Sequence, residues 1–418
     1  MGEIIIEGGR PLSGSVKIQG SKNAALPMMA AALLHDGEVI LHNCPRIADV
    51  FSMERILKSL GAETGWEDHT LRISCRNIQD TLIDGETARS MRSSVILMGS
   101  MLGRTGRICI ASPGGCTIGR RPVDLHLKAF EAMGARVNQE GGMLCAVSCG
   151  RLEGARVEFP ISSVGATENG ILAAVRARGT TYLENCALEP EIYHLCRLLQ
   201  AMGAEIGGVG TRSLRIRGVG ALRNAEYQVP PDRIVAGTYL YAAAATRGTV
   251  TLENPPLGEI ASIIEVYEKM GGQWEINGGK LVADASGVGR MVAFTKTQCY
   301  PGFPTDMQSM LMAVLLTIPG QGRIREEIFE DRFKAAEEFR KLGARIRVEG
   351  RDAWIEGGYP LTGTQVLARD LRGGAALAAA GLAAQGTTVI RDAGFVERGY
   401  EAIDKDLEAL GARIRMKR

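Results

Sequence analysis

The chain has 418 residues, of which 45% are hydrophobic and 23% charged, and its formal net charge is +2. This composition is typical of a soluble globular protein of two or three domains. A net charge so close to zero excludes a general nucleic-acid binder, which needs a strongly basic surface. Any anionic ligand must therefore be bound by a few placed residues.

The N-terminal sequence MGEIIIEGGRPLSG lacks the basic and long apolar segments of a signal peptide. Apolar runs such as MLMAVLLTI are far shorter than the ~20 residues that cross a bilayer. We therefore expect a cytoplasmic protein that contacts no membrane. Its nine cysteines are scattered and odd in number, so we expect no disulfide framework. Cys145 and Cys149 have no second ligand pair, and we expect no metal and no cofactor.

The main pattern along the chain is an internal repeat. A tetrapeptide of the type LGAR or MGAE recurs six times, with its first glycine 68 to 73 residues after the previous one, at positions 61, 134, 203, 271, 343 and 411. Each copy ends an amphipathic helix: Ile403, Leu407 and Leu410 lie on one helical face. The glycine that follows, such as Gly411, is predicted to form a left-handed helix cap.

Each repeat unit also contains a helix that is apolar on nearly all sides, and such a helix is buried. These helices are expected at 23–34, 91–102, 164–175, 233–245, 305–316 and 371–384. A short strand follows each of them, at 37–43, 106–112, 179–185, 248–254, 322–327 and 386–392. We therefore expect an α/β (α+β) fold of six repeats. The paired prolines Pro230 and Pro231 favour two domains of three repeats each.

Charged and polar residues recur where the helices begin. Near the starts of the buried helices stand Lys22 with Asn23, Arg92, Ser163 with Val164 and Gly165, Arg233, Asp306 and Arg372. Near the starts of the amphipathic helices stand Arg121, Glu189, Arg332 and Arg398. Arginine at a helix start opposes the helix dipole, and such a local conflict is typical of a functional site. Two facing domains would then bind a ligand with several anionic groups.

The segment SPGGCTIGRR (112–121) places a cysteine among glycines and before two arginines. Glycines allow the backbone to approach a ligand, and Arg120 with Arg121 would lower the pKa of the Cys116 thiol. A glycine-rich surface turn with an incidental cysteine is the alternative interpretation.

Nine motifs in order resemble one family over the whole chain. They are GSKNAALP (20–27), MRSS (91–94), PGGCTIGRRPVDLH (113–126), SSVGATEN (162–169), PPDRIVAGTY (230–239), GFPTDMQ (302–308), FEDRF (329–333), RDLRGG (369–374) and ERGYE (397–401). They resemble the UDP-N-acetylglucosamine enolpyruvyl (1-carboxyvinyl) transferases, which begin bacterial peptidoglycan synthesis. The resemblance implies two inside-out α/β barrel domains, each of three βαβαββ repeats around buried helices. The N-terminal domain would span 22–229, and the C-terminal domain 1–21 and 230–418.

The resemblance also implies a reaction and its residues. Phosphoenolpyruvate would give its enolpyruvyl group to the 3-hydroxyl of UDP-N-acetylglucosamine, with release of phosphate. Cys116 would protonate the methylene carbon, and Asp306 would remove the hydroxyl proton. The phosphate would be bound by Lys22, Arg121 and Arg398, and the carboxylate by Arg332 and Arg372, with Arg92 supporting the anion site. The sugar nucleotide would contact Asn23, Arg92, Arg121, Pro122, Val123, Asp124, Leu125, Ser163, Val164, Gly165, Asp306 and Ile328. The 112–121 segment would be a lid carrying Cys116.

Two positions depart from the family pattern. Arg120 stands where the family more often has a small residue, and Ile161 where one branch has a lysine. Two alternatives remain: a transferase like 5-enolpyruvylshikimate-3-phosphate synthase, and a non-catalytic paralogue that binds the nucleotide sugar as a regulator. The cysteine segment disfavours the first alternative, and the retained Cys116 and Asp306 disfavour the second. Only small-molecule partners are expected, with a monomer favoured.

Overall fold

The computed structural model describes residues 2–85, 91–111 and 122–417. These residues form two compact units, one made of 20–85, 91–111 and 122–230, the other of 2–19 and 231–417. Each unit contains three four-stranded sheets. The expected six-repeat α/β fold is confirmed, and the described strands form six separate sheets rather than a closed barrel.

The N-terminal unit contains three repeats and a final strand. Its elements are α1 (Lys22–Ala32), β3 (Glu38–His42), α2 (Ala48–Ser59), β4 (Glu63–Glu67), β5 (Thr70–Ser74); β6 (Leu82–Ile83), η1 (Arg92–Ile96), α4 (Leu97–Thr105), β7 (Arg107–Ala111), α5 (Asp124–Ala132), β8 (Arg136–Glu140), β9 (Met143–Val147); β10 (Arg156–Glu158), α6 (Val164–Ala174), β11 (Thr180–Glu184), α7 (Pro190–Ala201), β12 (Glu205–Gly207), β13 (Ser213–Arg217) and β14 (Ala225–Gln228).

The C-terminal unit starts with two N-terminal strands. Its elements are β1 (Glu3–Glu7), β2 (Ser13–Lys17), α8 (Arg233–Thr246), β15 (Thr249–Glu253), η2 (Leu257–Glu259), α9 (Ala261–Lys269), β16 (Gln273–Asn277), β17 (Lys280–Asp284); β18 (Phe294–Lys296), η3 (Thr305–Met307), α10 (Gln308–Leu316), β19 (Gly320–Arg325), α11 (Ala335–Lys341), β20 (Arg345–Glu349), β21 (Asp352–Gly357); β22 (Gln365–Leu367), α12 (Leu371–Ala383), β23 (Thr387–Arg391), α13 (Gly394–Glu397), α14 (Ile403–Ala409) and β24 (Arg413–Lys417).

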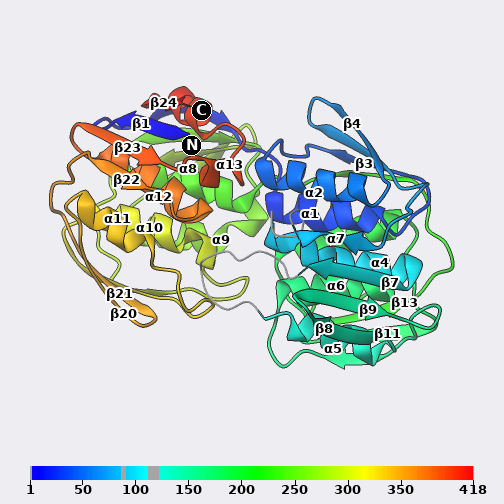
Figure 1. Cartoon of the computed structure of the whole chain (residues 1–418). Helices are drawn as coiled ribbons and strands as arrows, with labels where there is room; N and C mark the ends of the chain where they lie inside the picture. The colour runs from blue at the N-terminus through cyan, green and yellow to red at the C-terminus, as the bar shows by residue number, and fades with distance from the viewer. Residues whose placement is uncertain (1, 86–90, 112–121, 418) are drawn as a thin grey trace. The chain divides into compact units, whose positions relative to one another are not determined.

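All six sheets share one plan of strand pairing, and Figure 1 draws their strands as arrows. In the sheet β6-β7-β9-β8, β6 runs parallel to β7, while β9 is antiparallel to both β7 and β8. Three sheets borrow a strand from a distant part of the chain. β14 pairs with β3, β2 pairs with β15, and β1 lies between β23 and β24. The chain ends are therefore part of the sheets.

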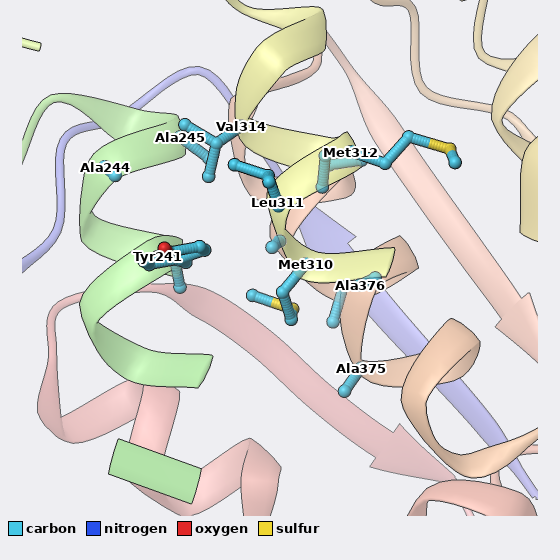
Figure 2. Packing of buried hydrophobic residues seen from close by; sticks show 14 of the residues in the cluster. Tyr241, Ala244, Ala245, Met310, Leu311, Met312, Val314, Ala375 and Ala376 are labelled. Carbon is cyan, nitrogen blue, oxygen red and sulfur yellow. The ribbon is translucent and has the colours of Figure 1, made fainter. Parts of the chain in front are cut away.

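The apolar helices form the core of each unit, as their composition predicts. In the C-terminal unit α8, α10 and α12 pack against one another, and Figure 2 shows Tyr241, Leu311 and Ala376 among the side chains in contact. In the N-terminal unit α4 and α6 approach closely at Gly99, where a Cβ would lie 2.5 Å from the carbonyl oxygen of Asn169. Small residues on these helices therefore bring their backbones close together.

The glycine after each amphipathic helix adopts a positive φ, as predicted. The φ angles are 104° at Gly61, 90° at Gly134, 99° at Gly203, 103° at Gly271, 95° at Gly343 and 82° at Gly411. L-residues with a side chain avoid this region, so glycine ends the helix at little cost. The repeated tetrapeptide is thus a helix stop that turns the chain into the next strand.

The sequence predicts no disulfide framework, but one cysteine pair is joined. Cys109 in β7 lies directly opposite Cys145 in β9, with 4.1 Å between the two Cα atoms, and a disulfide joins them. Their neighbours Ile108, Ile110 and Leu144 point into the core, so the cysteines occupy the outer face of the sheet. The spacing of these cysteines in the sequence does not indicate the pairing, because only the register of the two strands brings them together.

Candidate active site

The strongest polar cluster among the predicted site residues lies in the C-terminal unit. Asp306 accepts a hydrogen bond from Arg332 Nη2 at 2.7 Å on one carboxylate oxygen and from Arg372 Nη2 at 3.0 Å on the other. Three predicted site residues from three separate motifs therefore lie together, and both arginines bind the Asp306 carboxylate.

Burial makes this cluster electrostatically strong. The side chains of Arg332 and Arg372 are 4% and 5% exposed, whereas that of Asp306 is 26% exposed. Burial alone would lower the pKa of Arg372, but Asp306 raises it, and the net shift is upward. Two buried cations share one carboxylate, so the cluster carries one positive charge more than Asp306 balances. Such an excess favours a second anion.

A second anion needs donors, and two buried N–H groups of the cluster have no acceptor among the described residues. Among the described residues, Arg332 Nε and Arg372 Nη1 are buried and donate no hydrogen bond. A buried donor without an acceptor is costly, so it is usually satisfied by a ligand or by water. A carboxylate is a suitable acceptor, because guanidinium groups match its planar geometry.

Local structure holds each member of the cluster. Asp370 caps α12 and accepts hydrogen bonds from the backbone N–H groups of Arg372 (3.0 Å) and Gly373 (2.9 Å). Arg372 is thereby fixed in the first turn, where its charge opposes the helix dipole. Asp306 lies in the 3-10 turn η3 that leads into α10, and Arg332 lies in the loop before α11.

Tyr400 extends the cluster towards the ERGYE motif. Its ring lies 5.9 Å from the guanidinium carbon of Arg372, and its hydroxyl is 2.7 Å from Thr238 Oγ1. Burial raises the pKa of Tyr400, although Arg372 lowers it. Arg398 follows the short helix α13, two residues before Tyr400, and is half-buried. The structure therefore places the motif's tyrosine, which the sequence analysis did not single out, against a predicted ligand-binding arginine.

Lys22 is the predicted phosphate-binding residue of the N-terminal unit. It is the first residue of α1, which Ser21 caps, and its Nζ lies 2.7 Å from the carboxylate of Asp49. The two side chains are 13% and 4% exposed. The Lys22 ammonium is thus held at the helix start by a buried carboxylate that the sequence analysis missed. Asn23 follows it and is half-buried.

The predicted nucleotide segments meet through His126. Asn169 Nδ2 lies 2.7 Å from His126 Nδ1, and Asn169 also bonds to the backbone of Val95 and Gly99. A Cβ at Gly165 would lie 3.0 Å from the His126 ring, so the ring covers the start of α6. The histidine follows directly after Leu125, and therefore brings the 122–125 segment next to 163–165.

The remaining predicted residues have individual places. Arg92 starts η1, Ser163 caps α6 by accepting from Ala166 N, Val164 starts that helix, and Ile328 lies in the loop after β19. Pro122 and Asp124 are exposed, Val123 is half-buried and Leu125 is buried. Arg233 starts α8, with its guanidinium carbon 5.8 Å from the centroid of the Tyr300 ring, and Ile161 is 65% exposed. Cys116, Arg120 and Arg121 lie outside the described residues.

Comparison with known proteins identifies the family. The sequence matches the family described as EPSP synthase (3-phosphoshikimate 1-carboxyvinyltransferase) over residues 6–407. The enolpyruvyl transferase NikO from Streptomyces tendae has the same fold, with a TM-score of 0.90 at 23% identity, covering 100% of this chain and 99% of that one. Fold and site together define an enolpyruvyl (carboxyvinyl) transferase.

Full-length relatives narrow the class further. A UDP-N-acetylglucosamine 1-carboxyvinyltransferase 2 from Caldanaerobacter subterraneus subsp. tengcongensis is 42% identical over 99% of both chains. A UDP-N-acetylglucosamine 1-carboxyvinyltransferase from Desulfovibrio desulfuricans is 44% identical, also over 99% of both. The chain belongs to the UDP-N-acetylglucosamine 1-carboxyvinyltransferase family. Among its described helices, none is long and apolar enough to cross a membrane.

Proposed function

We propose that the protein transfers the enolpyruvyl group of phosphoenolpyruvate to the 3-hydroxyl of UDP-N-acetylglucosamine and releases phosphate, in the cytoplasm, as the first committed step of peptidoglycan synthesis. Two relatives that share 42% and 44% of its residues carry the name of this activity. The observation that carries the proposal is the buried Arg332–Asp306–Arg372 cluster, which combines a carboxylate base with two cations for an anionic substrate.

The anionic groups of phosphoenolpyruvate are assigned to two sets of cations. Arg332 and Arg372 bind its carboxylate through the buried N–H groups that have no acceptor among the described residues. Lys22, Arg121 and Arg398 bind its phosphate, with Arg92 supporting the anion site. Fixed cations of this kind stabilise both anions without reorganisation during the reaction.

Acid and base then act in sequence. Cys116 protonates the methylene carbon, which makes the neighbouring carbon electrophilic, and Asp306 takes the proton of the sugar hydroxyl as its oxygen bonds to that carbon. The resulting tetrahedral intermediate is steadied by Asn23. Return of a methyl proton to the Cys116 thiolate and cleavage of the carbon–oxygen bond to phosphate restore the double bond. The lid that carries Cys116 excludes water.

The sugar nucleotide is assigned to the N-terminal helix starts. Its nucleotide lies along Pro122, Val123, Asp124 and Leu125, and the N–H groups at Ser163, Val164 and Gly165 donate to the diphosphate. A helix N-terminus is suited to this, because its free N–H groups and dipole favour anions. The contacts of His126 support a shared site for these two segments. Ile328 completes the predicted contacts of the sugar nucleotide.

A phosphate-release assay without added metal tests the proposal and both alternatives. Phosphoenolpyruvate is combined with UDP-N-acetylglucosamine or with shikimate 3-phosphate, and Asp306→Asn is the inactive reference. Asp331→Asn is its matched control, because that carboxylate is 61% exposed. We expect turnover with the nucleotide sugar alone. Turnover with shikimate 3-phosphate would support the EPSP synthase alternative, and binding of the nucleotide sugar without turnover would support the regulatory paralogue.

A further inference from the structure

Beside the Asp306 cluster lies a buried carboxylate that the reaction does not use. Glu326 follows β19 and is 0% exposed. One of its oxygens accepts hydrogen bonds from Thr297 Oγ1 (2.9 Å), Ile328 N (2.8 Å) and Phe329 N (3.1 Å), and the other accepts from Thr305 Oγ1 (2.9 Å). A fully buried carboxylate is tolerated only when it is paired or well hydrogen-bonded, and these four donors meet that need.

The donors belong to both sides of the candidate site. Thr305 directly precedes Asp306 in η3, whereas Ile328 and Phe329 begin the loop that carries Arg332. The guanidinium of Arg332 also lies over the Phe329 ring, 5.8 Å from its centroid. Glu326 therefore binds the backbone of the arginine's loop with one oxygen and the neighbour of the aspartate with the other.

The loop has a second, independent support. Arg351 donates to the carbonyl oxygens of Glu326 (3.4 Å) and Glu327 (2.8 Å), and its own carbonyl accepts from Glu326 N at 2.8 Å. The Glu327 N–H donates to Thr297 Oγ1 at 3.0 Å. Because these bonds do not involve Thr305, the Thr305 hydroxyl can be removed while the loop that carries Arg332 keeps its frame.

We propose that Glu326 is a positioning residue, which acts through Thr305 to hold the Asp306 carboxylate at the distance from Arg332 that the reaction requires. This inference rests on the proposed role of Asp306 as the base. A displacement of about 1 Å in a reacting group costs on the order of 100-fold in rate. The single hydrogen bond from the Thr305 hydroxyl to Glu326 can therefore control turnover, although neither residue contacts a substrate in this proposal.

The test removes the Thr305 hydroxyl. Thr305→Val keeps the shape of the side chain, and we expect kcat to fall about 10-fold to 100-fold. KM for both substrates should stay within about twofold, because the anion-binding arginines remain. Thr305→Ser restores the donor and should recover most of the rate. Glu326→Gln should be milder than Thr305→Val, because its amide can accept from the loop and donate to Thr305 Oγ1.

Thr249→Val is the matched control. Its hydroxyl also donates to a carboxylate, Asp284 Oδ1 at 3.2 Å, on the exposed surface of the same unit. We expect its kcat to equal that of the wild type. Thermal melting of all variants separates loss of fold from loss of rate.

A double-mutant cycle decides whether Thr305 acts through Asp306. In the Asp306→Asn background, Thr305→Val should cost no further rate, since there is no base left to position. An unchanged kcat in Thr305→Val, or the same loss in both backgrounds, would overturn the inference while leaving the proposed function intact. Equal activity of Asp306→Asn and wild type, or no turnover by the wild type, would instead contradict the base or the function itself.

Discussion

Replacing Asp306 by asparagine should affect stability as well as rate, and the burial of the three side chains sets the size of the stability effect. The carboxylate balances two guanidinium groups whose side chains are 4% and 5% exposed, but it is itself 26% exposed. Removing one partner of a buried ion pair costs about 3–5 kcal/mol, whereas an exposed pair contributes about 0–1 kcal/mol. For this partly exposed carboxylate we expect a loss of about 2–4 kcal/mol.

A loss of about 3 kcal/mol lowers the melting temperature by about 6–12 °C in a domain of about 200 residues. Circular dichroism melting curves at low ionic strength measure this shift, with Asp331→Asn as the exposed control. Phosphoenolpyruvate should raise the melting temperature of Asp306→Asn more than that of the wild type, because its carboxylate replaces the missing partner. Turnover should fall by about two to four orders of magnitude, the usual contribution of a general base.

Two results would refute this reasoning. If Asp306→Asn melts within about 1 °C of the wild type, the aspartate does not balance the two buried arginines. If its turnover stays within about twofold of the wild type, the base lies elsewhere.

Three further predictions concern ligand affinity, cysteine labelling and pH. Arg332→Ala and Arg398→Ala should raise KM for phosphoenolpyruvate more than KM for the nucleotide sugar, since loss of a buried charge partner costs about 2–5 kcal/mol. An equal rise of the two KM values in steady-state kinetics would indicate a disturbed fold instead. An epoxide phosphonate should alkylate Cys116 alone, and faster when the nucleotide sugar is bound, because burial raises the pKa of Cys75, Cys186 and Cys196 to about 12. If peptide mass spectrometry finds the label chiefly at the exposed Cys149 or Cys299, Cys116 is not the reactive thiol. Burial raises the pKa of Asp406 from 3.8 to about 6, with Glu401 and Asp404 adding to the rise and the Tyr239 hydrogen bond opposing it. The folded state therefore binds this proton more tightly than the unfolded state, so stability should fall as pH rises from about 4 to 6. Asp406→Asn should flatten that part of the stability profile in denaturant titrations, and an unchanged slope would show that Asp406 does not cause it.

The repeat, the helix types and the helix stops could all be predicted from the sequence. Glycine at the end of each amphipathic helix is a local requirement, because its backbone φ is positive whatever packs around it. Helices that are apolar on all sides must be buried, and this property also depends on composition alone. The motifs were enough to predict the family. Three of their residues, Asp306, Arg332 and Arg372, do meet in the folded chain.

Only the tertiary structure decided which distant side chains the motif residues contact. Asp49 beside Lys22, His126 beside Gly165 and Glu326 bound to Thr305 lie in different elements from the residues they contact. His126 and Thr305 stood within quoted motifs, but nothing in the local pattern indicates which side chain they contact. The same holds for Cys109 and Cys145, which strand register brings together across 36 residues of chain. Local periodicity fixes which face a residue occupies, whereas the packing of sheets and helices fixes which distant residue it meets.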